Sequence, residues 1–511
     1  MRILITGGQS LLGQRLTQAL AEQADVTVVD RESGDLRDPA VCANLLEGVE
    51  TIIHLAPLYT RLEADHHSID HAARGTWHLL QPAANAGVKR VIVASSLRLY
   101  ESMPEGLKVD ETWRPRTQPN VDHFCAWLGE LSTREIARST RLPAICLRLG
   151  EVVDDAAIAG KPYDPRWLHV EDAVAAVLRA LEITPTGWQI FHIVSADPRS
   201  RWPLTRAKTE PFNWQPQRDF AQSKDEEMRS GGGGVQTAIR NPRPEWAPAT
   251  IRNVVIFGAG GPLAVATTAE LMGDYTLRLA DIKGIDELLA NPNPQSPGAP
   301  IPTERPQAPH EWRQVDVRDP DQVMAACEGM DAIINLSVLR SDPGDAYRVN
   351  AIGAYNVMKA AVAHGIRKVV HTGPFQLGDS SGLGYGWDTD VVDDVPARPG
   401  VEWVYFLSKL CGQEMVRSFA ETYDLIVPTL TFCQFLNPTV NVGQYLVSPL
   451  SVSWEDAARA LRCALEVQSL PSPYEYMHIG TDLPHAVFRT QKAKQLLGWQ
   501  PRDLFEDWLK K

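Results

Sequence analysis

Short, wholly apolar segments alternate with longer amphipathic segments along this chain of 511 residues. Residues 2–7 (RILITG) and 252–258 (RNVVIFG) are both apolar runs closed by a glycine, and each leads into a helical pattern. Strands that are apolar throughout are buried on both faces, which is typical of parallel sheets covered by helices. The pattern therefore predicts an α/β protein with doubly wound parallel sheets.

The second half of the chain repeats the pattern of the first half. Six segments match in the same order: VTVVD (26–30) with LRLAD (277–281), DLRDP (35–39) with DVRDP (316–320), TIIHLAP (51–57) with AIINLSV (332–338), GVKRVIVASS (87–96) with GIRKVVHTGP (365–374), HVEDAVAAVLRALE (169–182) with SWEDAARALRCALE (453–466), and FNWQP (212–216) with LGWQP (497–501). Chance does not account for six matches in one order, so we infer a tandem duplication.

Composition between the matched segments sets the expected boundaries. Residues 217–250 are polar, glycine-rich and then proline-rich, which is typical of a linker. We expect one domain over 1–216 and a second over 251–511, each ending in a small C-terminal substrate lobe. A proline-rich segment at 291–312 is expected to form a long surface loop near an adenine site.

Charge and cysteine usage exclude several classes of function. The formal net charge is −13, which argues against a nucleic-acid or membrane surface. The seven cysteines are scattered without the spacing of zinc ligands, so no metal site is expected. The first residues form a strand rather than a signal peptide, and no apolar run would span a bilayer. A cytoplasmic protein with a small-molecule substrate is the default expectation.

Glycine-rich turns follow the first strand of each half. Such a turn lets a diphosphate approach the backbone and the N-terminus of the next helix, as in Rossmann-type nucleotide-binding domains. We predict cofactor contacts at Gly7, Gly8 and Gly13 in the first half, and at Gly258, Gly260 and Gly261 in the second. Ser10 and Ala264 stand where further glycines would help. The alternative is that these glycines only make tight turns.

An aspartate ends the second strand of each half, as Asp30 and as Asp281. A carboxylate there accepts hydrogen bonds from a ribose diol and repels a 2′-phosphate, so NAD is favoured over NADP. Arg31 weakens this inference for the first half.

With these residues in place, the chain resembles the extended short-chain dehydrogenase/reductases, the NAD-dependent epimerase/dehydratase group. The resemblance covers nearly the whole chain, once in each half. The second half carries the more specific motifs, VNAIGAYNV (349–357), which looks like the group's VNxxGxxNV helix, and YFLSK (405–409), which looks like its YxxSK motif.

The resemblance implies roles for three residues of the second half. Tyr405 would be the general acid and base, and Lys409, one helical turn later, would lower the pKa of the phenol and hold the ribose. The group's substrate-orienting serine falls on Gly373 or Pro374, so Thr372 is expected to substitute for it. Ser380 and Ser381 are weaker candidates. Alternatively, Tyr405 and Lys409 are ordinary core and surface residues.

The first half lacks this set. Its serine position is present as Ser95 and Ser96, but our alignment places Phe124 at the tyrosine and Leu128 at the lysine. Neither side chain can exchange a proton, so we expect a catalytically degenerate domain. Further cofactor contacts are expected at Asp35, Leu36, Asp316, Val317, Asn335, Leu336 and Asn350. His54 and Arg148 are expected near the ligand or, alternatively, as structural residues, with Arg148 then on the surface.

Two functions are compatible with these residues. The first is an NAD(P)-dependent oxidoreductase or epimerase that acts through the second half on a sugar or nucleotide-sugar-like substrate. The second is a non-catalytic dinucleotide-binding protein or scaffold.

The segment containing Trp127, Leu128 and Leu131 suits packing better than chemistry. Members of the group usually dimerise through the corresponding helices, so the two halves are expected to form an intramolecular pseudo-dimer.

Overall fold

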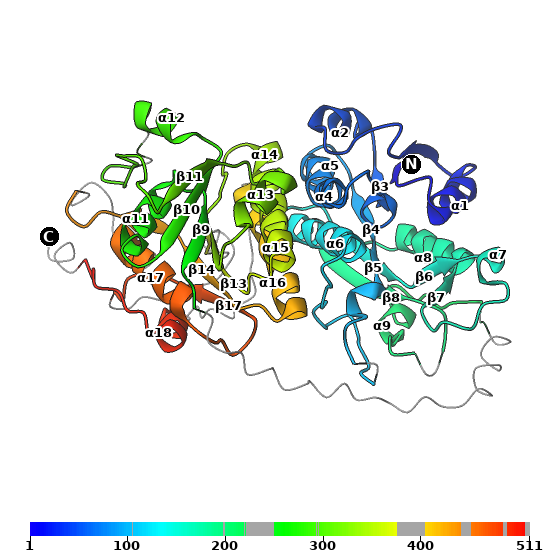
Figure 1. Cartoon of the computed structure of the whole chain (residues 1–511). Helices are drawn as coiled ribbons and strands as arrows, with labels where there is room; N and C mark the ends of the chain where they lie inside the picture. Colours follow the sequence, from blue (N-terminus) through cyan, green and yellow to red (C-terminus); the bar gives the residue numbers. More distant parts are fainter. Residues whose placement is uncertain are drawn as a thin grey trace. The chain divides into compact units, whose positions relative to one another are not determined.

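The computed structural model describes residues 1–104, 106–197, 200–218, 220, 250–292, 294, 296–375, 404–440, 451–483 and 488–505. The chain divides into two compact units, Met1–Pro244 and Glu245–Lys511. Each unit contains its own parallel sheet, covered by helices on both faces (Figure 1). The predicted α/β class with two tandem doubly wound sheets is confirmed.

The main sheet of the first unit has the strand order β2-β1-β3-β4-β5-β8, and all of its pairs are parallel. Its strands are β1 (Arg2–Thr6), β2 (Asp25–Val29), β3 (Thr51–His54), β4 (Arg90–Ser96), β5 (Ala144–Leu149) and β8 (Trp188–Ile193), and a small second sheet pairs β6 (Glu151–Val153) with β7 (Trp167–His169). Its helices are α1 (Leu11–Leu20), α2 (Pro39–Leu45), α3 (Ala56–Tyr59), α4 (Asp65–Asp70), η1 (His71–Gly75), α5 (Thr76–Ala83), η2 (Leu97–Tyr100), α6 (Val121–Ser139), α7 (Asp155–Ile158), α8 (Val170–Glu182) and α9 (Thr205–Lys208).

The main sheet of the second unit has the order β11-β10-β9-β12-β13-β14-β17, again with parallel pairs. Its strands are β9 (Asn253–Phe257), β10 (Thr276–Asp281), β11 (Glu311–Gln314), β12 (Ala332–Asn335), β13 (Lys368–Pro374), β14 (Val427–Phe432) and β17 (Tyr474–His478), and β15 (Gln434–Leu436) pairs with β16 (Ser451–Ser453). Its helices are α11 (Pro262–Leu271), α12 (Ile285–Ala290), α13 (Pro320–Cys327), α14 (Pro343–Tyr347), η3 (Arg348–Ile352), α15 (Gly353–Ala363), α16 (Val404–Tyr423), α17 (Trp454–Glu466) and α18 (Gln491–Leu497).

Equivalent helices cover equivalent faces in the two units. In the second unit α11 and α17 pack on one face of the sheet, and α13, α15 and α16 lie on the other (Figure 1). In the first unit α1 and α8 pack together in the same way, and α5 packs against α6. The central strands are fully buried because helices cover them on both sides, which explains their continuous apolar sequences.

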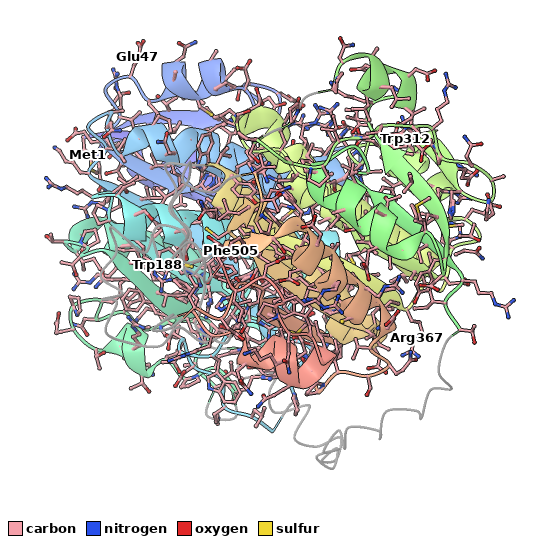
Figure 2. The ribbon with its side chains drawn as sticks, turned by 90° about the vertical axis from the view of Figure 1, so that its left-hand side faces the viewer. Met1, Glu47, Trp188, Trp312, Arg367 and Phe505 are labelled. Carbon is pink, nitrogen blue, oxygen red and sulfur yellow. The ribbon has the colours of Figure 1, made fainter. Side chains whose placement is uncertain are left out.

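An edge strand of each sheet carries a tryptophan that Figure 2 labels. Trp188 lies on β8, at one edge of the first sheet, and Trp312 lies on β11, at one edge of the second (Figure 2). Trp312 Nε1 donates to the carbonyl of Lys283 at 3.1 Å, so this edge is tied to the loop that follows β10.

The start of the expected linker packs against the first unit. The backbone N–H groups of Gln217 and Arg218 both donate to the carboxylate of Asp172, and Phe220 contacts the ring of Trp167. Residues 221–249, which hold the rest of the expected linker, lie outside the described residues. Residues 301–307 of the proline-rich segment line a cavity beside α11, together with Ala259 and Ile285.

Among the described residues, no helix combines the length and the apolar composition needed to cross a membrane. No group of three or more His, Cys, Asp or Glu side chains among them is arranged to hold a metal ion.

Candidate active site

The glycine turn of the second unit leaves the N-terminus of α11 open. Gly258 has a φ of +79°, and a Cβ atom there would lie 2.9 Å from the backbone of Leu336, so only glycine fits. Gly261 is the N-cap residue of α11, and no side chain caps the helix. Helix geometry leaves the N–H groups of Leu263 and Ala264, in the first turn, without acceptors within the helix. The turn therefore offers backbone donors at the place where a diphosphate would bind.

Asp281 connects the end of β10 to this turn. Its Oδ2 atom accepts from the N–H of Gly260 at 2.8 Å, and its Oδ1 atom accepts from the N–H of Lys283 at 3.0 Å. The carboxylate is partly exposed, so it keeps lone pairs that a ribose diol could use. The residues predicted from the sequence to contact a nucleotide, Asp281, Gly258, Gly260 and Gly261, are thus brought together here.

The glycine turn of the first unit is closed by its own serine. The Ser10 hydroxyl donates to the carbonyl of Gly7 at 2.8 Å and accepts from the N–H of Gly13 at 3.1 Å, so it caps α1. This side chain occupies the helix N-terminus that stays open in the second unit. The predicted contacts Gly7, Gly8 and Gly13 lie in one turn, but the donor of Gly13 is already used.

Asp30 is also arranged differently from Asp281. Its Oδ1 atom accepts from the N–H groups of Glu32 and Ser33 at 3.0 and 3.2 Å, so it organises its own loop. Among the described residues, the hydrogen bonds of its carboxylate go to Glu32 and Ser33 and not to the glycine turn. The first unit therefore keeps the residues of the nucleotide motif without the arrangement found in the second.

Equivalent Asp–Arg pairs lie just before α2 in the first unit and just before α13 in the second. Asp35 accepts from Arg37 at 2.8 Å, and Asp316 accepts from Arg318 at 2.7 Å. Partial burial would raise the pKa of each carboxyl, but the hydrogen bonds from the arginine hold it below its usual value. The next residue in each unit was also predicted to contact the cofactor, and that contact stays a prediction. Leu36 and Val317 are buried, and they lie against Gly75 and Gly353.

Tyr405 and Lys409 lie one turn apart near the start of α16, as their spacing predicts. Both side chains are buried, with 8% and 2% of their surface exposed. Lys409 Nζ donates to the carbonyl of Ser337 at 2.9 Å and lies 3.5 Å from the carbonyl of Thr372. The ammonium group thus connects α16 to the segments at the carboxyl ends of β12 and β13.

Burial changes the acidity of both groups. Burial and the nearby positive charge of Arg340 lower the pKa of Lys409 to about 7, so it is only partly protonated near neutral pH. Burial raises the pKa of Tyr405, and this rise is opposed by the charge of Arg340 and by a hydrogen bond from it. Arg340 is therefore a cation placed to favour the ionised form of Tyr405.

Arg340 is the functional candidate that the sequence analysis missed. Its guanidinium carbon lies 5.5 Å from the centroid of the Tyr405 ring, within the range of a cation–π contact. It follows β12 by five residues, in a loop that carries no motif of the family. Only the fold, which brings this loop to the N-terminal end of α16, reveals the contact.

Asn350 holds this loop against α16. Its Nδ2 atom donates to the carbonyl of Leu339 at 2.7 Å and to the hydroxyl of Ser408 at 2.9 Å, and its Oδ1 atom accepts from the N–H of Leu339. Asn350 lies in η3, a π-helical turn of the kind that often marks functional sites. We predicted that Asn350 contacts the cofactor. In the structure its amide bonds to Leu339 and Ser408 and so holds the loop that contains Arg340.

The structure corrects the role expected for the Thr372 hydroxyl. It donates to the carbonyl of Asn335 at 2.9 Å inside the sheet, two residues before the end of β13. Pro374, which has no hydroxyl, ends this strand where Ser96 ends β4. Thr372 therefore contributes its carbonyl to Lys409 rather than a hydroxyl to a substrate. Ser380 and Ser381 lie outside the described residues.

The structure also corrects our alignment of the first unit. Helix α6 begins VDHFCAWLGE and α16 begins VYFLSKLCGQ, so Asp122 corresponds to Tyr405 and Ala126 to Lys409. Phe124 and Leu128, which we placed there, are fully buried. The two helices share a glycine at the same position, Gly129 in α6 and Gly412 in α16, and this glycine shifts the correspondence by two residues.

That glycine fixes the register by its close packing. A Cβ atom on Gly412 would lie 2.3 Å from the carbonyl oxygen of Asn350, and one on Gly129 would lie 2.4 Å from the Pro57 side chain. The next residues also correspond. Gln413 lies against Gly373, and Glu130 accepts from the hydroxyl of Ser95 at 2.6 Å.

The remaining polar candidates are structural. His54 bonds to Thr6 and to Thr76, each at 2.8 Å, and burial lowers its pKa to about 3, so it is neutral. Arg148 is not on the surface, as the alternative had it, because it is buried in an ion pair with Glu130 at 2.6 Å.

Two predicted contacts lie where β12 ends. The Asn335 side chain accepts from the hydroxyl of Ser337 at 2.6 Å, and Leu336 lies against the glycine turn. Their contact with a cofactor stays a prediction.

One protein-family model matches both units of the chain. The model of the NAD dependent epimerase/dehydratase family matches residues 3–154 and 254–448, which together make up more than half of the chain. The match falls once in each unit, which agrees with the duplication inferred from the sequence.

Comparison with curated proteins finds more distant relatives. Sterol demethylase protein B of Methylococcus capsulatus is 31% identical over 140 residues, which are 24% of this chain and 43% of that protein. The chain thus spans less than half the length of this relative. Uronate dehydrogenase of Agrobacterium fabrum is 25% identical over 37% of this chain and 68% of its own length. The L-arabinose 1-dehydrogenase (NAD(P)(+)) of Haloferax volcanii is 26% identical over 37% of this chain and 81% of its own.

Solved structures with a similar chain trace include a uronate dehydrogenase from Agrobacterium tumefaciens. The two chains are 22% identical, with a TM-score of 0.41, over 51% of this chain and 87% of the other.

Proposed function

Because the chain belongs to the NAD dependent epimerase/dehydratase family, we propose that it is an NAD-dependent oxidoreductase acting on a sugar-like substrate through its second unit. The observation that carries this proposal is the position of Tyr405. Its phenol lies beside the guanidinium of Arg340, one helical turn from Lys409, in the unit whose glycine turn is open.

The residues of the second unit fit an NAD molecule along the carboxyl edge of the sheet. The open N-terminus of α11 would hold the diphosphate, and Asp281 would hold the adenosine ribose. Bound NAD would supply the hydride acceptor. The remaining steps belong to the protein's own side chains.

Tyr405 is proposed as the group that takes the proton from a substrate hydroxyl. A phenol performs this step only as the phenolate, so the neighbouring positive charges set the pH at which it works. Lys409 is held by two strand-end carbonyls and loses its charge near neutral pH. Arg340 stays charged throughout, so we assign it the larger share in stabilising the phenolate at alkaline pH.

The substrate class rests on the relatives. Proteins named uronate dehydrogenase and L-arabinose 1-dehydrogenase (NAD(P)(+)) are both similar to this chain. We therefore propose a monosaccharide or sugar acid that is oxidised at a carbon bearing a hydroxyl group.

The test is turnover by the purified full chain with NAD⁺ and a panel of aldoses and hexuronates, followed by the absorbance of NADH. Replacing Tyr405 by Phe should lower kcat at least about 100-fold, the usual contribution of a general base, and leave NADH binding unchanged. Tyr423→Phe, on the exposed end of the same helix, is the matched control and should keep full activity. Equal turnover by wild type and Tyr405→Phe would refute the assignment.

A second candidate is a dinucleotide-binding protein without catalysis. The observation that favours it is Pro374, which leaves the end of β13 without a hydroxyl to orient a substrate. Tight NADH binding with no turnover on any member of the panel would establish this alternative.

A further inference from the structure

The connection between β10 and β11 in the second unit is largely non-helical, although parallel strands are usually joined by a helix. Here α12 has only six residues, and residues 296–309, which follow it, form neither helix nor strand. Residues 301–307 run beside α11 and line a cavity of about 180 Å³ together with Leu279 and Trp312. We call residues 296–309 the strap.

The start of the strap is joined to the segment that follows β15. The Nδ2 atom of Asn437 donates to the carbonyl of Gly298 at 3.2 Å. Gly298 has a φ of +73°, and a Cβ atom there would lie 2.9 Å from the side chains of Asn437 and Val440, so only glycine fits this contact. The Oδ1 atom of Asn437 accepts from the N–H groups of Thr439 and Val440, which fixes the orientation of the amide. We call the contact between Gly298 and Asn437 the latch.

The strap and α12 both lie beside the glycine turn that precedes α11. Ala259, in the turn, lines the same cavity as the strap, and a Cβ atom on Gly260 would lie 2.7 Å from the side chain of Leu288 in α12. A dinucleotide on a sheet of this type lies along the carboxyl ends of the strands. The latch therefore joins two segments that border the proposed NAD site, one following β10 and the other following β14 and β15.

Few hydrogen bonds hold the strap. Five of its residues are prolines, which have no N–H group to donate. Among the described residues, the backbone–backbone hydrogen bonds of the strap run from Ala299 to Ser296 at 3.1 Å and from His310 to Gln307 at 2.9 Å. Both are local turns, so neither fastens the strap to the sheet or to α11.

The contacts of the strap with the rest of the unit are also weak. Arg305 lies 2.5 Å from Asp286, but about two thirds of each side chain is exposed, so the pair contributes little. The cavity beneath the strap removes van der Waals contacts from the atoms that line it. Segments with few hydrogen bonds and incomplete packing open at a low cost in free energy. The strap can therefore leave α11 while the sheet stays folded.

We propose that the strap is a cover over the NAD site, closed by the latch, that opens whenever the dinucleotide enters or leaves. The latch then slows the release of NADH, a step that limits turnover in many enzymes. This inference rests on the binding of NAD to the second unit proposed above.

Opening of the strap is measured without cofactor by the reactivity of a thiol placed beneath it. Leu279 is 6% exposed and lines the cavity, so Leu279→Cys gives a thiol that the strap covers. Labelling with iodoacetamide is read by mass spectrometry on the peptide that contains residue 279, so the native cysteines do not contribute. Adding Asn437→Ala, which removes the donor of the latch, should speed the labelling several-fold, and saturating NADH should slow it without that change. Asn44→Ala, at an exposed position of α2 in the first unit, is the matched control and should leave the rate unchanged.

Release of NADH is measured by stopped-flow fluorescence after displacement with excess NAD⁺. Asn437→Ala should release NADH several-fold faster than wild type, and Gly298→Ala, whose Cβ atom separates the latch, should do the same. Tight NADH binding with unchanged release in both variants, or unchanged labelling in Asn437→Ala, would overturn the strap alone. Absence of NADH binding in the wild type would overturn the proposed function as well.

Discussion

At the scale of single residues, burial and neighbouring charge together set the pKa of Tyr405. Burial raises the pKa of the phenol, and Arg340 opposes that rise. Lys409, whose pKa is lowered to about 7, loses its charge as the pH rises through neutrality. Arginine keeps its charge at any accessible pH, so Arg340 supplies the positive charge under alkaline conditions.

We expect Arg340→Met to shift the pH profile of sugar oxidation upward by about one unit. A positive charge favours the phenolate and lowers the pKa of Tyr405, so its removal raises that pKa and moves the active range to higher pH. The measurement is kcat against pH with saturating NAD⁺. Arg340→Lys, which keeps a charge, should shift the profile less. An unchanged profile in Arg340→Met would show that Lys409 alone controls the phenol.

A second residue-scale prediction concerns the buried ion pair of the first unit. Glu130 and Arg148 are 1% and 4% exposed, and the pair also includes the hydroxyl of Ser95. Glu130→Gln leaves the arginine charge buried without its partner, which should lower the free energy of unfolding by about 3–5 kcal/mol.

The matched control for that prediction is Glu182→Gln, which breaks an exposed pair with Arg179. It should cost less than about 1 kcal/mol. Denaturant unfolding followed by tryptophan fluorescence measures both. Similar losses in the two variants would show that the buried Glu130–Arg148 pair contributes no more to the free energy of unfolding than an exposed pair does.

At the scale of elements, the two glycine turns differ in the residue that caps the following helix. Gly261 leaves the N-terminus of α11 open, whereas Ser10 caps α1 with its hydroxyl. Similar local sequences thus give an uncapped helix N-terminus in one unit and a capped one in the other. The difference was visible in the sequence as Ser10, but its effect depends on hydroxyl geometry that only the structure provides.

Gly261→Ser should therefore weaken NADH binding at least about tenfold, equivalent to about 1.4 kcal/mol. The new hydroxyl is expected to bond to the Gly258 carbonyl and the Ala264 N–H, as Ser10 does with Gly7 and Gly13. Titration of NADH fluorescence gives the affinity. Ser10→Gly is the control and should leave it unchanged. Undiminished affinity in Gly261→Ser would show that the diphosphate binds elsewhere.

The elements themselves were largely predictable from the sequence. Apolar strands such as 332–335 and 253–257 are found as β12 and β9, because a strand buried on both faces needs a continuous apolar sequence. The role of Asn350 was not predictable, since its bonds to Leu339 and Ser408 join segments far apart in the chain. The contact between Arg340 and Tyr405 escaped prediction for the same reason.

At the scale of the whole molecule, duplication has left two units with the same fold and different sites. The second unit keeps an uncapped glycine turn and the Tyr405 cluster, whereas in the first unit Ser10 caps α1, and Asp122 and Ala126 stand at the positions of Tyr405 and Lys409. The sequence shows the duplication through six ordered matches. It does not show which helices meet between the units, so the pseudo-dimer stays a prediction.

We propose that the second unit alone binds NAD. Fluorescence titration of the full chain with NADH should give one site per chain, lost in Asp281→Ala and unaffected by Asp30→Ala. Two sites per chain, or a single site lost in Asp30→Ala and kept in Asp281→Ala, would contradict the account.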